Sequence, residues 1–283
     1  MAELTHFTRE GLRFDVRDGG PADGPVVILL HGFPQDSTSW DRVAPLLHAQ
    51  GLRTLAPDQR GYSPGARPSA VSSYAQPQLV ADVLALADAA ETERFHLVGH
   101  DWGGAIAWST AIAEPERVSS LTVLSTPHPS ALGRALRTPD QLRRSWYIGA
   151  FQVPKLPELV FAGRAGSLLR RSGVPEEAAQ HYDERFATPR DMRGPINWYR
   201  ATVRSSGLTR GSGAAAFVRV PTTFVWGNRD FALGRTAAEH TADYVTAPYR
   251  FVELDASHWL PEREPEAVAS AVIGRVLGDD AAG

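Results

Sequence analysis

Short, mostly apolar runs of strand length recur through the first half of the chain. They cover Val26 to Leu30, Leu52 to Ala56, Phe95 to Val98 and Leu121 to Leu124. Between the second and third runs, apolar residues recur at the three-to-four-residue spacing of an amphipathic helix. Buried strands that alternate with helices are typical of a parallel sheet with helices on both faces. We therefore expect an α/β fold with a mostly parallel, doubly wound sheet.

This alternation stops after Thr126. Residues 127–215 hold prolines, arginines and large aromatic residues without strand alternation, and strand-like runs return only at Thr222 to Trp226 and Tyr249 to Leu254. A final helix is expected after Pro265. The sequence thus predicts a first core segment over residues 1–126, a helical cap over 127–215 inserted after the sixth strand, and a second core segment over 216–283.

Glycine clusters mark two further positions. Phe14 and Val16, followed by Asp18-Gly19-Gly20, indicate an antiparallel hairpin at the sheet edge with its turn at the glycines. Gly211-Ser212-Gly213, at the end of the predicted cap, is typical of a hinge.

Charge and cysteine content exclude several function classes. The chain has 29 basic and 32 acidic residues, hence a net charge of −3, and no run of like charges. Such a balance gives no reason to expect binding to nucleic acid or to an anionic membrane, so a small-molecule partner is favoured. The absence of cysteine excludes disulfides, thiolate nucleophiles and cysteine-bound zinc. With neither a signal-peptide pattern nor a long apolar run, we expect a cytoplasmic protein.

Asp101 lies between a buried strand and a helical pattern, with Gly99 and Gly103 on either side. This spacing is typical of a nucleophile elbow, a strained turn in which backbones pass too closely for larger side chains. A carboxylate with a pKa of about 3.9 is already an anion at neutral pH, so it can attack saturated carbon without a base. The alternative is that Asp101 only caps the following helix.

A second segment, Gly61-Tyr62-Ser63-Pro64-Gly65, matches the elbow pattern of serine hydrolases. No strand precedes it, and Pro64 lacks the N–H that the residue after the nucleophile must donate. We interpret this segment as a surface turn.

Attack by Asp101 would produce an ester, whose hydrolysis needs N–H donors for an oxyanion. The N–H of Trp102 lies at the start of the predicted helix. His31-Gly32-Phe33-Pro34 follows the strand Val26 to Leu30, where this architecture places its second donor, here the N–H of Phe33. By itself the segment could also be a plain turn that leaves a strand.

Activation of water needs a base, and His258 is the best placed of nine histidines. It follows the last strand, at the sheet edge where open α/β folds bind ligands. His31 and His100, beside tight glycines, are expected to be buried loop residues. Asp230 follows the strand Thr222 to Trp226 and gives the chain order nucleophile, acid, histidine, whereas Asp255 is an alternative acid only three residues before His258.

Several motifs together resemble the α/β-hydrolase-fold epoxide hydrolases over essentially the whole chain. They are HGFP, DQRGYSPG, GHDWGG, NRDFAL and ASHWLPEREPE. Two cap segments, residues 146–154 and Asn197-Trp198-Tyr199-Arg200, are similar to those in which this family holds a pair of tyrosines over the nucleophile. By this match the pair is Tyr147 and Tyr199, although both could instead anchor the packing of the cap.

The resemblance implies hydrolysis of a small apolar epoxide to a vicinal diol, with water and without metal or cofactor. Asp101 would attack the ring, Tyr147 and Tyr199 would polarise its oxygen, and His258 with Asp230 would activate water. Trp198, Phe151 and Pro34 are expected to contact the substrate.

Haloalkane dehalogenases use the same kind of aspartate and histidine and are the nearest alternative. They bind halide through two N–H donors. Trp102 would serve as the first, but Phe33 stands where the asparagine that supplies the second is expected. A non-catalytic ligand-binding member of the fold is a further alternative, and a homodimer is possible.

Overall fold

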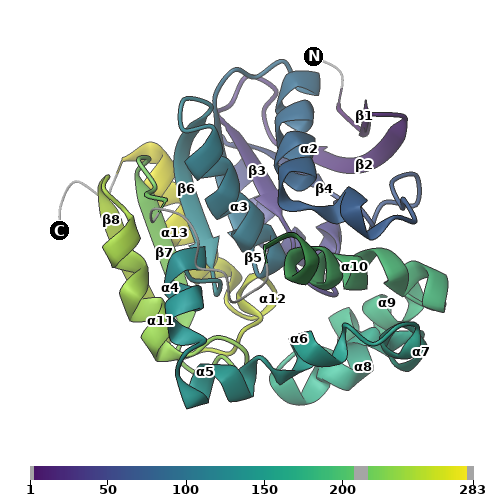
Figure 1. Cartoon of the computed structure of the whole chain (residues 1–283). Coiled ribbons are helices and arrows are strands. Elements are labelled where there is room, and N and C mark those ends of the chain that lie inside the picture. Colours follow the sequence, from purple (N-terminus) through teal and green to yellow (C-terminus); the bar gives the residue numbers. More distant parts are fainter. Residues whose placement is uncertain (1–2, 207–215, 279–283) are drawn as a thin grey trace.

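An eight-stranded sheet forms the centre of the molecule (Figure 1), in a computed structural model that describes residues 3–206 and 216–278. Strands β3 to β8 run parallel, β2 is antiparallel to β4, and β1 is antiparallel to β2. The strand order is β1-β2-β4-β3-β5-β6-β7-β8. The predicted fold class is therefore confirmed. The strands are β1 (His6–Arg9), β2 (Leu12–Gly19), β3 (Val26–Leu30), β4 (Arg53–Pro57), β5 (Phe95–His100), β6 (Val118–Leu124), β7 (Thr222–Gly227) and β8 (Tyr249–Leu254).

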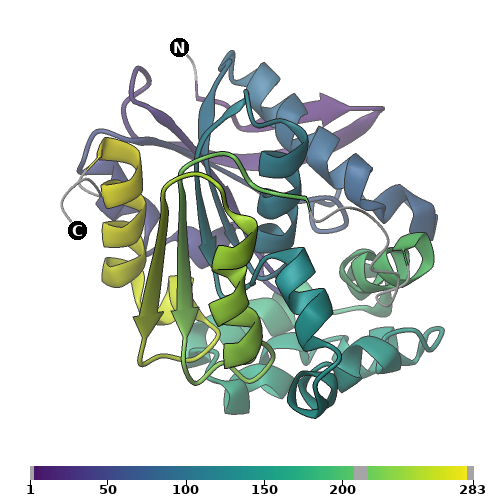
Figure 2. The ribbon, with the colours of Figure 1, turned by 60° about the vertical axis from the view of Figure 1, so that its left-hand side comes forward.

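Helices cover both faces of this sheet (Figure 2). Successive side chains of a strand point to opposite faces. In β3, Ile28 and Leu30 accordingly belong to one buried cluster, and Val27 and Leu29 to another. The first cluster includes residues of α2 (Gln76–Ala89) and α3 (Trp102–Ala113), and the second includes residues of α1 (Ala44–His48) and α13 (Pro265–Leu277). Further elements of the core are η1 (Ser37–Trp40), η2 (Val71–Tyr74), α11 (Arg235–Glu239), η4 (His240–Tyr244) and α12 (Leu260–Arg263).

The edge hairpin exists, but its predicted turn is wrong. Strands β1 and β2 form the hairpin, and the chain turns at Glu10 and Gly11, which have φ angles of 51° and 75°. Asp18 and Gly19 instead continue β2 beside β4. The Asp18 carboxylate accepts a hydrogen bond from Arg53 at 2.6 Å, which holds this Asp-Gly segment in the sheet.

Short helices make up most of the predicted cap, and they lie at the end of the molecule to which the parallel strands point (Figure 2). This arrangement places the cap over the carboxyl edge of the sheet, where the predicted site residues are. The predicted hinge at residues 211–213 lies outside the described residues, and the bounds of the cap remain a prediction. The helices of this segment are α4 (Pro129–Ala135), α5 (Pro139–Arg144), α6 (Trp146–Ala150), α7 (Leu156–Phe161), α8 (Ala165–Leu169), η3 (Arg170–Ser172), α9 (Glu176–Arg185) and α10 (Pro189–Ser206).

Candidate active site

Asp101 occupies a strained turn between β5 and α3. Its φ of 49° and ψ of −118° lie in a region that non-glycine residues rarely adopt. A Cβ atom on Gly99 would lie 2.3 Å from the carbonyl oxygen of Gly103, and one on Gly103 would lie 2.2 Å from that of Leu30. Both glycines are therefore needed for the strand, the turn and the helix to pass one another, as the elbow pattern predicts.

The side chain of Asp101 does not cap α3. Its Oδ1 instead accepts a hydrogen bond of 2.7 Å from the backbone N–H of Phe33. Gly32 permits this approach, because a Cβ there would lie 2.4 Å from the Cβ of Asp101. Trp102 is the first residue of α3, where backbone N–H groups have no partner within the helix. The carboxylate thus accepts a hydrogen bond from one predicted oxyanion donor, and the other donor belongs to the next residue in the chain.

His258 lies between two carboxylates. Its Nε2 is 3.6 Å from Oδ2 of Asp101, and its Nδ1 is 2.6 Å from Oδ2 of Asp230. The other carboxylate oxygen of Asp230 accepts backbone hydrogen bonds from Ala232 and Leu233 at 2.8 and 3.0 Å. The backbone therefore fixes Asp230, and Asp230 fixes the orientation of the imidazole ring.

Asp255, the alternative acid, lies elsewhere. Its side chain is 76% exposed and forms an ion pair with Arg229 at 2.9 Å. The structure thus brings Asp230, and not Asp255, to His258.

Asp101 and His258 stabilise each other's charged forms. Burial acts to lower the pKa of His258, but the charge of Asp230 and the nearby carboxylate of Asp101 outweigh it and raise this pKa to about 10. Burial acts to raise the pKa of Asp101, but the nearby charge of His258 and the hydrogen bond from the Phe33 N–H keep it below its ordinary value. At neutral pH the two residues form a carboxylate–imidazolium pair.

Further buried polar groups hold the backbone of His258. Its carbonyl oxygen accepts hydrogen bonds from His100 at 2.8 Å and from Ser125 at 2.9 Å. His100 also contacts Gln35 at 2.7 Å, and Gln35 donates to Glu262 at 2.6 Å. His100 is buried, as predicted. The roles of Ser125, Gln35 and Glu262 in this hydrogen-bond network were not evident from the sequence. They depend on contacts between residues far apart in the chain.

Two tyrosines of the cap lie close together near Asp101. Tyr147 on α6 and Tyr199 on α10 have ring centroids 6.0 Å apart, and the Tyr199 ring is 4.8 Å from that of Trp102. Burial, followed by the negative charge of Asp101, raises the pKa values of both phenols. Both hydroxyl groups are therefore neutral donors at ordinary pH. The two segments singled out by sequence thus meet beside the nucleophile.

Aromatic side chains surround this pair. Phe151 lies 4.8 Å from the Tyr199 ring and 5.4 Å from that of Phe33, which also contacts Phe161. Trp198 donates its indole N–H to the carbonyl of Arg60 at 2.8 Å, and its ring is 5.7 Å from Trp102. Pro34 is buried directly after Phe33. Contact of Phe151, Trp198 and Pro34 with a substrate remains a prediction.

Comparison with known proteins identifies the family of this chain. Residues 25–265 match the model of the alpha/beta hydrolase fold family. Epoxide hydrolase A of Mycobacterium tuberculosis is 32% identical, over 95% of this chain and 95% of its own length. Epoxide hydrolase 4 of Mus musculus is 34% identical, over 91% of this chain and 74% of its own.

The chain belongs to the α/β-hydrolase-fold family, among the epoxide hydrolases. A solved structure from a study of epoxide hydrolases in metagenomes from hot environments agrees with this α/β-hydrolase over 98% of this chain and 99% of that one. The TM-score is 0.84 and the sequence identity is 30%.

The second elbow-like segment of this α/β-hydrolase is not a nucleophile site. Ser63 accepts a hydrogen bond from the Asp15 N–H at 2.9 Å and donates one to the Asp58 carbonyl at 2.7 Å. The prediction of a surface turn is wrong in one respect, because Tyr62 and Ser63 are buried. The hydrogen bonds of Ser63 hold the loop against the core, and only its tip at Pro64 and Gly65 is exposed.

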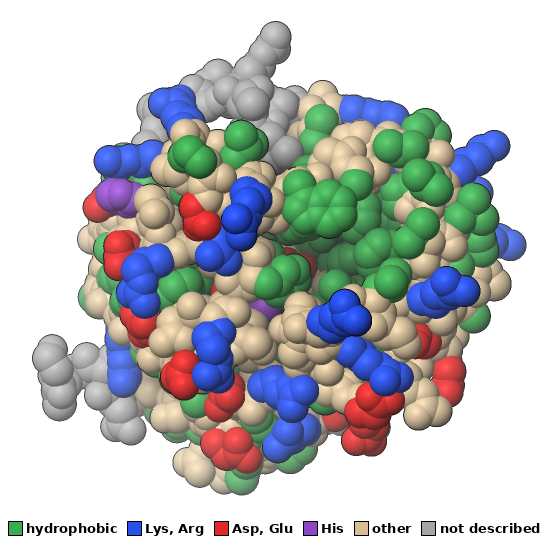
Figure 3. All heavy atoms as spheres, turned by 90° about the horizontal axis from the view of Figure 1, so that it is seen from below, with side chains coloured by type: hydrophobic (Ala, Val, Ile, Leu, Met, Phe, Trp, Pro, Cys, Tyr) green, Lys and Arg blue, Asp and Glu red, His purple; other side chains and the backbone are tan. Residues whose placement is uncertain are grey.

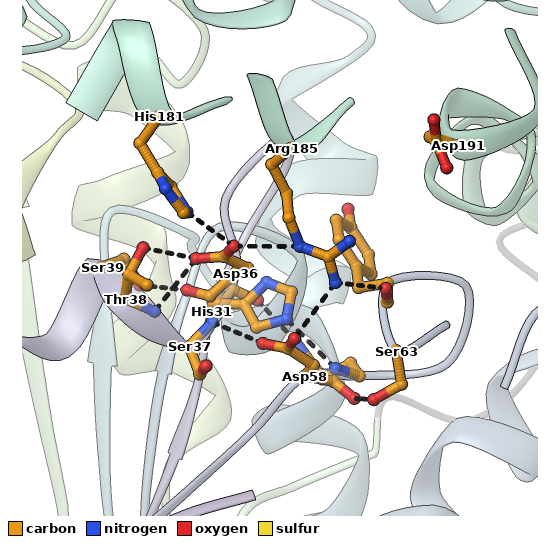
Figure 4. A network of polar contacts seen from close by, with 12 residues as sticks. His31, Asp36, Ser37, Thr38, Ser39, Asp58, Ser63, His181, Arg185 and Asp191 are labelled. Atoms are coloured by element: carbon orange, nitrogen blue, oxygen red, sulfur yellow. Dashed lines mark hydrogen bonds and ion pairs between the residues drawn. The ribbon is translucent and has the colours of Figure 1, made fainter. Parts of the chain in front are cut away.

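A partly buried ion-pair network, for which the sequence holds no signal, joins the cap to the core of the α/β-hydrolase (Figure 4). His181 and Arg185 of α9 approach the buried Asp36 carboxylate at 2.8 and 3.4 Å. Arg185 also lies 3.2 Å from Asp58. We refer to Asp36, Asp58, His181 and Arg185 as the cap–core network. In sequence these residues are ordinary loop and helix charges, so no motif indicated their pairing.

Within residues 3–206 and 216–278 no group of three or more histidine, aspartate or glutamate side chains is arranged to hold a metal ion. No helix in them has the length and apolar character needed to cross a bilayer.

Proposed function

We propose that this α/β-hydrolase converts an epoxide to a vicinal diol through a covalent ester of Asp101. One observation carries the proposal: an anionic carboxylate in a strained elbow lies between His258 and a backbone N–H donor, with the phenols of Tyr147 and Tyr199 nearby. The names of the related proteins agree with this activity.

In the first step, Asp101 attacks a ring carbon of the epoxide. A carbon–oxygen bond forms to the carboxylate, the ring carbon–oxygen bond breaks, and the ring oxygen takes a proton from Tyr147 or Tyr199. The resulting tyrosinate is then reprotonated, and the His258 imidazolium is the group that loses this proton. The products of this step are a hydroxyalkyl ester of Asp101 and a neutral His258.

In the second step, the neutral imidazole removes a proton from water. The hydroxide adds to the ester carbonyl, and the N–H groups of Phe33 and Trp102 stabilise the oxyanion. When the intermediate collapses, the acyl–oxygen bond to the diol breaks, and the proton of the newly added hydroxyl passes to the diol oxygen. Asp101 is again a carboxylate and His258 an imidazolium, so the reaction consumes only the epoxide and water.

The His258→Ala variant tests this sequence of steps. It retains the Asp101 carboxylate but lacks the base, so it should form the ester and fail to release diol. Intact-protein mass spectrometry with a reactive aryl epoxide should show a gain equal to the whole epoxide mass, because ring opening expels nothing. Peptide mapping should place the adduct on the peptide that contains Asp101.

The Asp101→Ala/His258→Ala double variant is the matched control and should form no adduct. An adduct elsewhere, or diol production by His258→Ala at the wild-type rate, would contradict the two-step mechanism. An adduct formed only with a haloalkane, with a mass gain equal to the haloalkane less hydrogen halide, would favour dehalogenase chemistry instead.

A further inference from the structure

The outer surface of the cap exposes an unusual concentration of apolar side chains. Of eleven large hydrophobic residues that are exposed among the described residues, seven lie within residues 142–168, on or beside helices α5 to α8. Trp146 is 71% exposed and Leu159 is 63% exposed. Exposed apolar residues gathered in one region mark an interaction site. We call these seven residues the apolar cap patch; they are Leu142, Trp146, Val153, Leu156, Leu159, Val160 and Leu168.

Positive charge surrounds the apolar cap patch. Residues 142–171 contain six basic residues and a single acid, Glu158, which is buried and paired with Arg200 at 2.5 Å. Arg144 and Arg170 form ion pairs with Asp140 and Glu176. The other four are exposed, and within the described residues no ion pair is found for them; they are Arg143, Lys155, Arg164 and Arg171. The segment is thus strongly cationic in a chain whose net charge is −3.

We propose that the apolar cap patch docks the enzyme on the surface of an anionic phospholipid bilayer. Apolar side chains with a tryptophan, set among lysine and arginine, match the interface between lipid headgroups and acyl chains. A second copy of the chain fits less well. In a two-fold symmetric dimer the patch would face itself and bring like charges together.

The patch also lies on the helices that form the proposed site. On α6, the exposed Trp146 directly precedes Tyr147. On α7, Leu159 and Val160 face outward, whereas Phe161 contacts Phe33. Figure 3, which views the molecule from the cap side, shows hydrophobic side chains beside a hollow, with Lys and Arg side chains around them.

If the proposed function holds, docking on a bilayer would give the enzyme access to substrate. An apolar epoxide dissolved in a bilayer would reach the aromatic site from the docked face. The expectation that the chain does not bind anionic membranes came from its overall charge, which hides the basic character of this one segment.

Vesicle flotation of the full chain tests the proposal. Vesicles of phosphatidylcholine mixed with phosphatidylglycerol should bind the wild-type protein, and vesicles of phosphatidylcholine alone should bind it far less. Leu159→Ser and Lys155→Glu should each lower binding to the anionic vesicles by about tenfold. Leu277→Ser and Arg94→Glu are matched controls that should bind as wild type. Leu277 is 51% exposed near the C-terminal end of α13, and Arg94 is exposed at the amino edge of the sheet.

Vesicle binding needs no turnover, so its outcome is independent of the proposed reaction. Absence of binding to the anionic vesicles, or equal loss in the control variants, would overturn the proposal. So would a dimer in sedimentation velocity that Leu159→Ser dissociates, because the patch would then be a subunit interface. Turnover of a water-soluble epoxide should be unchanged in Leu159→Ser, which shows that the variant is folded.

Discussion

The carboxylates of Asp230 and Asp101 together determine the protonation of His258. In the free enzyme the Asp101 carboxylate helps to raise the pKa of His258 to about 10, so the imidazole is protonated and cannot act as a base. In the proposed mechanism, esterification would neutralise Asp101 and remove this contribution. His258 would then become a base in the ester, which is the state that needs one.

The Asp101→Ala variant should fold and lose more than 99% of epoxide turnover, roughly 3 kcal/mol of barrier or more. It should also change the pH dependence of stability. The folded pKa of His258 lies above its ordinary value of 6.5, so its contribution is complete below pH 6.5 and is lost as the pH rises towards 10. Without Asp101 the folded pKa of His258 should be lower, so this loss should still begin near pH 6.5 but should be smaller and end at a lower pH. Urea unfolding over a pH series measures it, with Asp255→Ala as the exposed-acid control. A variant that keeps a tenth of the wild-type rate would show that Asp101 is not the nucleophile.

Tyr147 and Tyr199 should have overlapping effects. Each phenol has a raised pKa, so either one can donate to the ring oxygen when the other is missing. Tyr147→Phe and Tyr199→Phe should each slow formation of the ester, and the double variant should be nearly inactive on epoxides. Rapid-quench measurement of ester formation separates this step from hydrolysis. Normal turnover by the double variant would mean that both tyrosines serve only the packing of the cap.

The β5–α3 turn contains glycines that have no room for a side chain. A Cβ on Gly103 of α3 would meet the backbone oxygen of Leu30 of β3 at 2.2 Å, and neither the helix nor the strand can move without disturbing the packing around the sheet. Gly103→Ala should therefore destabilise the protein by about 3 kcal/mol. Gly133 in α4 is the matched control, because a Cβ there meets nothing within 4 Å.

Gly133→Ala should be neutral or stabilise by up to about 1 kcal/mol, since alanine favours the helix. Urea unfolding followed by tryptophan fluorescence gives both values. An equal effect of the two substitutions would show that close packing at the elbow does not limit the choice of residue.

The difference between local sequence signals and tertiary contacts explains how much could be predicted from the sequence. The buried strands and the elbow were predictable because apolar runs and the spacing of Gly99 and Gly103 are local signals. The edge turn was not, because Asp18 is held extended by Arg53, a residue of another strand. The position of Asp230 beside His258 followed from chain order, whereas the approach of Glu262 to Gln35 depends on tertiary packing alone.

At the scale of the whole molecule, the cap–core network ties α9 to the loops beneath it (Figure 4). Burial opposes ionisation of Asp36, but hydrogen bonds from His181 and Thr38 keep its pKa well below the ordinary value. The hydrogen bond to Asp36 in turn raises the pKa of His181. The contribution of Asp36 is present above about pH 4 and is lost on acidification, and that of His181 is lost as the pH rises through its raised pKa. The network should therefore be strongest in weak acid.

Asp36→Asn tests this connection between cap and core. It leaves Arg185 near Asp58 but removes the anion that His181 contacts, so the protein should lose about 2 kcal/mol of stability at pH 6. Part of the wild-type loss of stability in acid should also disappear. Asp243→Asn is the matched control, because Asp243 pairs with His240 at 2.9 Å on the exposed surface, where such pairs contribute little. Urea unfolding at pH 3, 6 and 8 compares the two variants. If Asp36→Asn follows the wild-type pH profile, the network does not connect the cap to the core energetically, and the packing of α9 alone holds it in place.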